Sequence, residues 1–369
     1  MSEVPHLRFP EFTEEWKRKR FKDVCNITTG NKNTQDKSDD GIYPFYVRSQ
    51  IVERINSWTF DGEAILTAGD GVGVGKVFHY STGKIGVHQR VYILSDFKCD
   101  GKYLYSYFAG NFYNRVKRMS AKNSVDSVRM EMIADMPISL PSNEEQKKIG
   151  HLLALLDERI ATQNKGIEDL KLLKSAIIER AYRNRSYHPC RIGDVIEQIS
   201  ERNKDKSIDM VLSVSNKQGF INQSEQFEDR IIASEDTSNY KIVHKNDFAY
   251  NPARINVGSI ARLTTIDTGI VSPMYICFRV KNSVATEYME HFFSTSYFFY
   301  EMQKRLEGSV RQCLSFESIC NIPIYIPSSE EQHTIGKKIS VLLDKIDIET
   351  HYHCKLVEQK HYLLRQMFI

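Results

Sequence analysis

The stretch Pro137-Ile-Ser-Leu-Pro-Ser-Asn-Glu-Glu-Gln146 decides the fold of this chain, because it occurs a second time as Pro323-Ile-Tyr-Ile-Pro-Ser-Ser-Glu-Glu-Gln332. The two copies stand 186 positions apart in a sequence of 369 residues, so the interval is close to half of the chain. A repeat of this length is too long for a solenoid unit. It indicates a molecule built from two duplicated halves.

Each copy predicts the start of a long helix. Ser142 and Glu145, like Ser328 and Glu331, have capping-box spacing, with acidic residues at the positive end of the helix dipole. After each cap, apolar residues recur every three or four positions without an interrupting proline, over about 40 residues or roughly 60 Å. Two such helices should pack on each other as an antiparallel coiled coil, because the chain between them must return.

The segments that precede the two long helices share one sequence pattern. Short apolar runs between turn residues predict strands over about 25–100 and 196–282, and aromatic helical patterns follow at 102–118 and 286–307. The predicted fold is therefore α+β, with two mixed α/β globules separated by two long helices and related by an internal pseudo-twofold duplication. The expected domains are a first globule at 1–141, a first long spacer helix at 142–185, a second globule at 186–327 and a second spacer helix at 328–369.

Composition and charge narrow the class of protein. The chain is 41% hydrophobic and 26% charged, as soluble globular proteins are, and it contains no apolar run of membrane-spanning length and no signal-peptide pattern. Its seven cysteines include no CxxC pair, which favours a reducing compartment, so we expect a cytoplasmic protein without a membrane partner. The net charge of +3 means that any DNA-binding surface must be a local patch.

The order globule, capped helix, globule, capped helix resembles the specificity subunit of type I restriction-modification systems. The opening Leu7-Arg-Phe-Pro-Glu-Phe-Thr-Glu-Glu-Trp16 and the sequence Phe60-Asp-Gly-Glu63 are also similar to that family, and the resemblance covers nearly the whole chain. It implies a non-catalytic protein with two target recognition domains, each of which reads half of a bipartite site in double-stranded DNA. The target sequence does not follow from the resemblance, because the globules vary within the family.

The resemblance also implies protein partners. The long helices are expected to act as a spacer and to dock methyltransferase subunits, two in number, while restriction subunits join for cleavage. The residues of the repeated motif that would take part in docking are Glu144, Glu145, Gln146, Glu330, Glu331 and Gln332.

The glycine-rich run Gly69-Asp-Gly-Val-Gly-Val-Gly-Lys76 could suggest a phosphate-binding loop. A Walker loop needs Ser or Thr after the lysine, where Val77 stands, and a Rossmann turn needs a following helix, where the pattern predicts a strand. We expect either an ordinary loop or one whose backbone approaches DNA phosphates, with Gly73 and Lys76 as contacts. The run has no obvious partner near 255–262, so the two half-sites should differ.

Asn251-Pro-Ala-Arg254 resembles the catalytic motif of adenine methyltransferases. That chemistry needs a second proline and an aromatic residue that stacks on the flipped base, and the chain offers neither. We therefore expect methyl transfer to belong to a partner and expect no cofactor. The alternative function is a methyltransferase or nuclease fused to its own DNA reader. Arg254 is expected to be either a DNA contact or a surface arginine. A coiled-coil protein without a DNA role is a further alternative.

His351, His353, Cys354 and His361 could suggest a metal site. On a helix, positions 351 and 353 point roughly 200° apart and cannot bind one ion together. His353 falls on the apolar stripe, so we expect a polar layer between the helices and no metal.

Basic segments follow the two aromatic helices at equivalent places in the duplication. Lys and Arg supply phosphate contacts, while Arg, Asn and Gln can also bond base edges; a solvated helix end is the alternative. The candidates of this kind, with others from the strand-rich parts, are Arg118, Lys122, Asn123, Arg311, Gln312, Gln89, Arg90 and Lys217.

Overall fold

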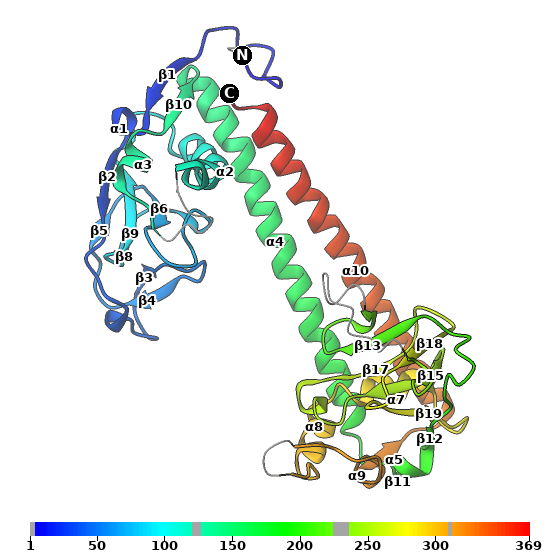
Figure 1. Cartoon of the computed structure of the whole chain (residues 1–369). Helices are drawn as coiled ribbons and strands as arrows, with labels where there is room; N and C mark the ends of the chain where they lie inside the picture. The colour runs from blue at the N-terminus through cyan, green and yellow to red at the C-terminus, as the bar shows by residue number, and fades with distance from the viewer. Residues whose placement is uncertain (1–3, 120–126, 224–235, 309–311) are drawn as a thin grey trace. The chain divides into compact units, whose positions relative to one another are not determined.

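The computed structural model describes residues 4–119, 127–223, 236–308 and 312–369. The chain divides into two compact units, of which unit 1 comprises residues 1–165 and 349–369, and unit 2 comprises residues 166–348 (Figure 1). Each unit contains one globule and part of both long helices, α4 (Asn143–Tyr182) and α10 (Ser329–Gln366). The compact units therefore divide each long helix near its middle, whereas the sequence suggested separate helical domains.

Within its described residues, the globule of unit 1 has two four-stranded sheets and a two-stranded sheet. The first contains, in spatial order, β2 (Asn26–Thr29), β9 (Val91–Ser95), β6 (Ala64–Ala68) and β7 (Phe78–Ser81). The second contains β4 (Glu53–Ile55), β3 (Tyr43–Tyr46), β8 (Lys84–Val87) and β5 (Phe60–Asp61). The two-stranded sheet pairs β1 (Lys17–Arg20) with β10 (Pro137–Leu140). The helical segments of the globule are α1 (Phe21–Val24), η1 (Thr34–Asp36), α2 (Gly101–Met119) and α3 (Met130–Ala134).

The described residues of unit 2 repeat this arrangement strand for strand. One sheet has the order β12 (Ile196–Ile199), β19 (Ile276–Val280), β16 (Phe248–Tyr250) and β17 (Ile260–Arg262). The other has the order β14 (Gly219–Asn222), β13 (Val211–Ser215), β18 (Thr268–Val271) and β15 (Lys241–His244), while β11 (His188–Arg191) pairs with β20 (Pro323–Ile326). The helical segments among the described residues of this globule are α5 (Ile192–Val195), η2 (Ile255–Val257), α7 (Thr286–Phe292), α8 (Ser296–Gln303) and α9 (Phe316–Cys320).

The pairing directions agree as well. β3 and β8 are parallel, as are β13 and β18, in otherwise antiparallel sheets. The predicted internal duplication is thereby confirmed. The aromatic helix predicted at 286–307 is divided in unit 2, because Thr295 caps a new helix by accepting a hydrogen bond from the N–H of Phe298 (3.1 Å).

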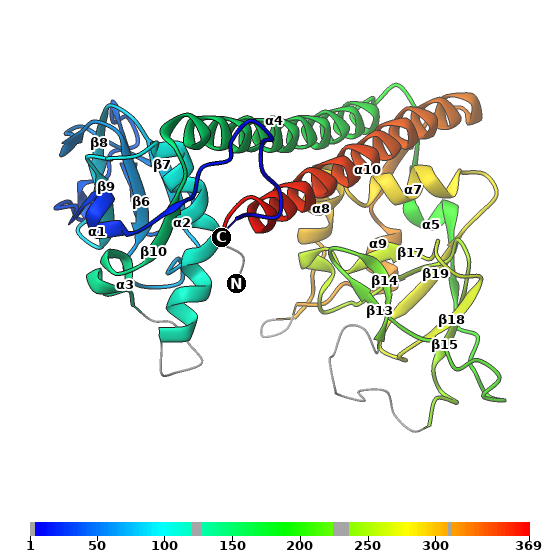
Figure 2. The same cartoon turned by 90° about the horizontal axis from the view of Figure 1, so that it is seen from above.

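The central strand of each globule is buried on both faces. In unit 1, Ile65 of β6 packs with α2, whereas Leu66 packs with the second sheet. In unit 2, Phe248 faces the helices and Ala249 faces the other sheet. Alternate side chains of a strand point to opposite faces, so one sheet forms a middle layer between helices and the second sheet. Figures 1 and 2 show α2 of unit 1 between this sheet and α4.

The long helices run antiparallel where they pair within unit 1, as predicted. Gln163 donates a hydrogen bond to the carbonyl oxygen of Glu349 (3.1 Å), and Asp157, earlier in α4, forms an ion pair with Lys360, later in α10. In unit 2, Ile178 of α4 and Ile339 of α10 belong to one hydrophobic cluster with the globule. Over the ranges that the structure describes, we find no helix with the length and apolar character needed to cross a bilayer.

Candidate nucleic-acid interface

Three loops of unit 1 meet at one carboxylate. Asp70, in the β6–β7 loop, binds Arg48 of the β3–β4 loop (Oδ1 to Nη1, 2.8 Å) and binds Arg90 of the β8–β9 loop through its other oxygen. The side chain of Asp70 is 21% exposed, and those of Arg48 and Arg90 are 43% and 59% exposed. A guanidinium carries five N–H donors, so both arginines keep donors for a ligand while Asp70 holds them in place.

The charge of this carboxylate is maintained by its neighbours. Partial burial opposes ionisation of Asp70, but the hydrogen bonds from Arg90 and Arg48 outweigh it and hold the pKa below its ordinary value. The cluster of two cations and one anion is therefore net positive. Arg48 is a member that our reading of the sequence missed, since nothing in its local sequence indicates that it meets Arg90.

The β6–β7 loop needs its glycines for close packing. A Cβ on Gly73 would lie 2.3 Å from the carbonyl oxygen of Arg48, and Gly75 has a φ of +65°, in the left-handed region. Lys76 is exposed, with its ammonium 5.5 Å from the centre of the Tyr113 ring. A strand, β7, follows the loop as predicted. The same loop therefore carries Asp70, which binds the two arginines, and an exposed lysine beside the Tyr113 ring of α2.

Gln89 and the segment before α3 border the same loops. The amide of Gln89 donates a hydrogen bond to Asn33 Oδ1 (2.6 Å), and the side chain of Gln89 is exposed. The N–H of Val128 donates to the carbonyl oxygen of Gly69 (2.7 Å), which ties the segment before α3 to the glycine loop. Arg118 is exposed at the end of α2, whereas Lys122 and Asn123 lie outside the described residues.

Unit 2 carries equivalent loops with different side chains. Its β16–β17 loop presents Arg254, which is exposed, and ends at Gly258, which has a φ of +89°. A Cβ on Gly258 would lie 3.7 Å from the Cβ of Asn216, so this loop meets the β13–β14 loop, which carries the exposed Lys217. The glycine run of unit 1 thus has a structural counterpart between β16 and β17, which corrects the interpretation that it has no partner. The two loops differ in sequence and share only their place between equivalent strands.

The segment before α9 repeats the contact made before α3. The N–H of Leu314 donates to the carbonyl oxygen of Pro252 (3.1 Å), as Val128 does to Gly69 in unit 1. Gln312 is exposed two residues earlier, and Arg311 lies outside the described residues. We call these equivalent surfaces the loop surfaces of the two units. They comprise loops 47–52, 69–77 and 88–90 with segment 127–129 in unit 1, and loops 216–218, 251–259 and 272–275 with segment 312–314 in unit 2.

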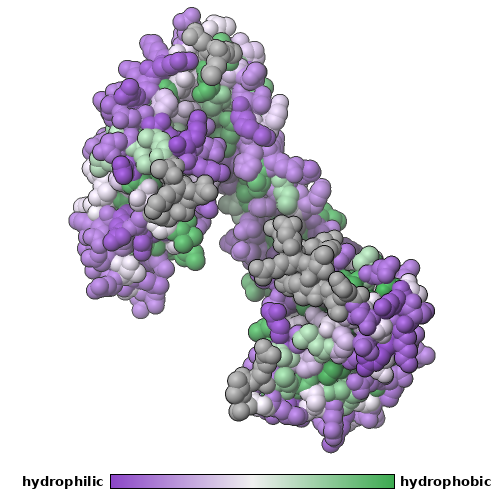
Figure 3. All heavy atoms as spheres, viewed as in Figure 1, coloured by the Kyte–Doolittle hydropathy of each residue, from purple (hydrophilic) through white to green (hydrophobic). Residues whose placement is uncertain are grey.

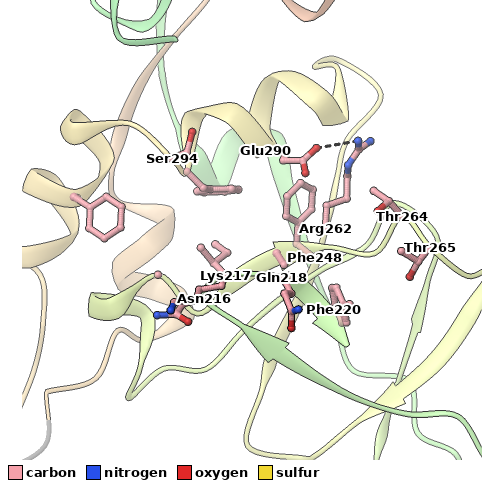
Figure 4. A pocket seen from close by; sticks show the side chains of 16 residues that line it. Asn216, Lys217, Gln218, Phe220, Phe248, Arg262, Thr264, Thr265, Glu290 and Ser294 are labelled. Atoms are coloured by element: carbon pink, nitrogen blue, oxygen red, sulfur yellow. Dashed lines mark ion pairs between the residues drawn. The ribbon is translucent and has the colours of Figure 1, made fainter. Parts of the chain in front are cut away.

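A pocket of about 530 Å³ adjoins the loop surface of unit 2 (Figure 4). Lys217 and Gln218 line it from the β13–β14 loop, opposite Arg262 of β17. Arg262 forms ion pairs with Glu287 (2.6 Å) and Glu290 (2.9 Å), while its Nε is buried without a hydrogen-bond partner. The pocket therefore combines charged and amide groups that can bond polar edges of a ligand.

The glutamines of the repeated motif are structural. Gln146 donates to the carbonyl oxygen of Pro141 (2.9 Å) and accepts from the N–H of Asp100 (3.0 Å). Gln332 likewise donates to Pro327 (3.0 Å) and accepts from Ala285 (2.7 Å). Both side chains are buried, so each glutamine fastens the start of a long helix to its own globule.

The glutamates of the motif differ between the two copies. Glu145 is fully buried and paired with Arg8, whereas Glu144, Glu330 and Glu331 are exposed. Of the six motif residues considered for docking, only these three exposed glutamates are accessible to a partner. As for metals, the described His, Cys, Asp and Glu side chains nowhere gather in a group of three that could hold an ion.

Comparison with known proteins gives consistent matches. The family described as Type I restriction modification DNA specificity domain matches residues 13–172 and 184–357. The chain is 29% identical over 168 residues to the type I restriction enzyme EcoDI specificity subunit of Escherichia coli, covering 44% of this chain and 37% of that protein. It is 22% identical over 287 residues to the putative type I restriction enzyme MjaX specificity subunit of Methanocaldococcus jannaschii, covering 72% and 63%. The matches thus span between about a third and just under two thirds of these relatives.

A solved structure agrees in fold. The S subunit of a type I restriction-modification system from M. genitalium superposes with a TM-score of 0.64 at 15% identity, over 99% of both chains. Since the family match occurs twice and spans most of the sequence, the chain belongs to the Type I restriction modification DNA specificity domain family, with one copy of the domain in each half.

Proposed function

We propose that this chain is the non-catalytic DNA sequence-specificity subunit of a cytoplasmic type I restriction-modification complex. In this proposal, each loop surface reads one half of an asymmetric bipartite site in double-stranded DNA. One observation carries the proposal: the same set of loops, held by the same backbone contacts, occurs in both units with different side chains. Identical readers would select a palindrome, whereas two different readers select two different half-sites.

The side chains divide into two roles. Arginines held by a carboxylate suit bidentate bonds to guanine in the major groove, so Arg48 and Arg90 are the proposed base readers of unit 1. Lysines, and arginines for which no carboxylate partner is found among the described residues, suit phosphate contacts, which fix position but carry no sequence information. Those proposed here are Lys76, Arg118, Lys217 and Arg254, with Gln89 and Gln312 as amides that can bond base edges.

We further propose that the long helices dock the methyltransferase subunits, two in number, and that restriction subunits join for cleavage. The portions of α4 and α10 in unit 2 expose large apolar side chains, including Leu172 (68% exposed), Val341 (60%) and Ile348 (63%). Figure 3 shows apolar atoms at the surface along the long helices. Val341 and Ile348 stand seven residues apart and therefore lie on one face of α10, and apolar side chains gathered on one face are typical of protein–protein contact sites.

The experiment that tests the function is methylation of a randomised DNA library by the chain assembled with its methyltransferase subunits. Arg90→Ala should relax the base preference in one half-site, and Arg254→Ala should alter binding through the other. Lys84→Ala is the matched control, because Lys84 is an exposed cation at the opposite end of β8 from the Arg90 loop. Unchanged base preference in Arg90→Ala would contradict the proposal, as would unchanged DNA affinity in Arg254→Ala.

A second measurement tests the non-catalytic part of the proposal. The purified chain alone, incubated with DNA and labelled S-adenosylmethionine, should transfer no methyl groups. Transfer without a partner would favour the alternative of a methyltransferase fused to its own reader.

A further inference from the structure

An N-terminal arm, residues 4–16, covers the start of α4 in unit 1. Arg8 forms a two-pronged ion pair with Glu145, with its Nε and Nη2 each 2.8 Å from a carboxylate oxygen. Leu7 donates its N–H to the carbonyl oxygen of Gln366 (2.9 Å), and the Trp16 ring meets the Tyr103 ring edge-on at 6.3 Å. The arm is thereby anchored to both long helices and to the globule.

Aromatic contacts accompany this arginine. The Phe9 ring lies 4.4 Å below the ammonium of Lys148, one turn into α4, and Phe9 packs against the main hydrophobic cluster of unit 1. As a result Glu145 has no exposed side-chain surface, and only 11% of the Arg8 side chain is exposed. The recognition element that the arm offers to the helix start is an arginine followed by an aromatic residue.

The equivalent place in unit 2 is built differently. There the chain passes from the end of α4 to the start of β11 in the five residues 183–187, where unit 1 has the longer arm before β1. Glu331, the counterpart of Glu145, is exposed. Its carboxylate accepts hydrogen bonds from the N–H (3.3 Å) and the hydroxyl (3.1 Å) of Ser328, and from no other described residue. The acid that an arginine covers in unit 1 is thus accessible in unit 2.

A pocket of about 550 Å³ lies beside this acid. Its apolar wall includes Tyr187, which stands directly before β11 as Trp16 stands before β1, together with Val284 and Ile326. Its acidic side chains are Glu331 and Asp194. An acidic rim on an apolar hollow is complementary to a cation joined to an aromatic ring, which is the chemistry that the arm presents in unit 1.

We propose that this pocket binds a peptide segment of a partner protein, in which an arginine pairs with Glu331 and an adjoining aromatic residue packs against Tyr187 and Val284. In unit 1 the N-terminal arm of the chain itself covers the equivalent glutamate, Glu145. The two glutamates would therefore be covered in the same way, Glu145 by a segment of this chain and Glu331 by a segment of a partner. The proposal deepens the docking part of the proposed function and rests on it for the source of the segment. It requires no DNA binding.

The probe for this site is a synthetic peptide with the sequence of residues 4–16, labelled with a fluorophore and titrated with the full chain in the absence of DNA. We expect saturable binding that weakens at least tenfold for the chain variant Glu331→Gln and for a peptide with Arg8→Ala. Gln at this position still serves in a capping box, so Glu331→Gln should fold normally. Glu317→Gln, at an exposed acid of unit 2 that does not line the pocket, is the matched control and should bind like the unaltered chain.

The position of the bound peptide is checked by alkylation of Cys190, which lines the pocket. Bound peptide should slow alkylation of Cys190 but not of the exposed Cys354. Affinity that responds to Glu145→Gln instead of Glu331→Gln would mean that the peptide displaces the arm in unit 1, and would overturn the proposal. So would dimerisation of the chain that depends on both Arg8 and Glu331, because the occupant would then be a second copy. Loss of methylation specificity with peptide binding intact would count against the proposed function alone.

Discussion

The start of α4 in unit 1 and the start of α10 in unit 2 have nearly the same sequence but different surroundings. Gln146 and Gln332 make the same pair of hydrogen bonds: each donates to a prolyl carbonyl oxygen and accepts from a backbone N–H of its globule. One residue earlier, Glu145 is buried under Arg8 while Glu331 is exposed. The glutamine contacts that fasten each helix to its globule are thus the same in both units. The adjoining glutamate differs in exposure, because Arg8 covers it in unit 1 alone among the described residues.

The globules show the same division between scaffold and surface. Tyr103 and Tyr288 both donate their hydroxyls to a backbone carbonyl of β10 or β20, at 2.7 and 2.9 Å. By contrast, the aromatic pair Tyr80 and Tyr105, between β7 and α2, corresponds to the ion pair of Arg262 with Glu290 between β17 and α7. Hydrogen bonds to backbone atoms are thus the same in the two globules, whereas the paired side chains between β7 and α2 and between β17 and α7 differ in chemical type.

The largest difference in stability between the two helix starts is expected for the variant Arg8→Ala. It leaves Glu145 buried without its partner, which costs about 3 kcal/mol, whereas Glu331→Ala removes an exposed acid and should cost less than about 1 kcal/mol. Hydrogen exchange followed by mass spectrometry should show faster exchange over residues 143–156 in the first variant, with little change over residues 329–342 in the second. Equal protection in both variants would mean that the buried pair contributes little.

The two glutamines should instead behave alike. Replacing Gln146 or Gln332 by Met keeps the side-chain volume but leaves one buried N–H and one carbonyl without their partners, at a cost of about 2 kcal/mol in either unit. Urea unfolding monitored separately for each unit by hydrogen exchange measures the two losses. A large difference between them would show that one globule is held to its helix by other contacts.

Acid should act on unit 2 through His291, whose counterpart in α2 of unit 1 is Ser106. Burial first, and then the charges of Arg262 and Lys174, lower the pKa of His291 from 6.5 to about 4. The unfolded chain therefore binds a proton that the folded chain does not between these values, so stability is lost as the pH falls from about 6.5 towards 4. We expect His291→Ser to remove about 1–2 kcal/mol of this loss between pH 7 and 5, measured as the pH dependence of the unfolding midpoint.

The long helices, their antiparallel pairing and the duplication could be predicted, because capping residues and apolar spacing are local signals that occur twice. The cluster at Asp70 could not, since Arg48 reaches it only through the parallel pairing of β3 with β8. The counterpart of the glycine loop was missed for a related reason. It is marked by a backbone bond from Leu314 to Pro252, which requires no particular side chain. Burial of Glu145 also depends on an arm more than 130 residues away in sequence.

The smallest expected effect concerns the loop surfaces, which the proposed function assigns to different half-sites. Asp70→Asn keeps the shape of the side chain but removes the charge that holds Arg48 and Arg90, two partly exposed groups. Stability should change by less than about 1 kcal/mol, because ion pairs at the surface contribute little.

Discrimination in the first half-site should nevertheless fall several-fold, since base readers that are no longer held in place lose part of their geometric selectivity. Overall DNA affinity should stay equal or rise, because one negative charge has been removed from a surface that meets phosphates. The second half-site should be unchanged, since the proposed function assigns it to the loop surface of unit 2, whereas Asp70 belongs to unit 1. Methylation of a library with one half-site fixed and the other randomised measures both quantities. A variant that loses affinity for every sequence, without loss of discrimination, would show that Asp70 supports the loops and has no part in holding the readers.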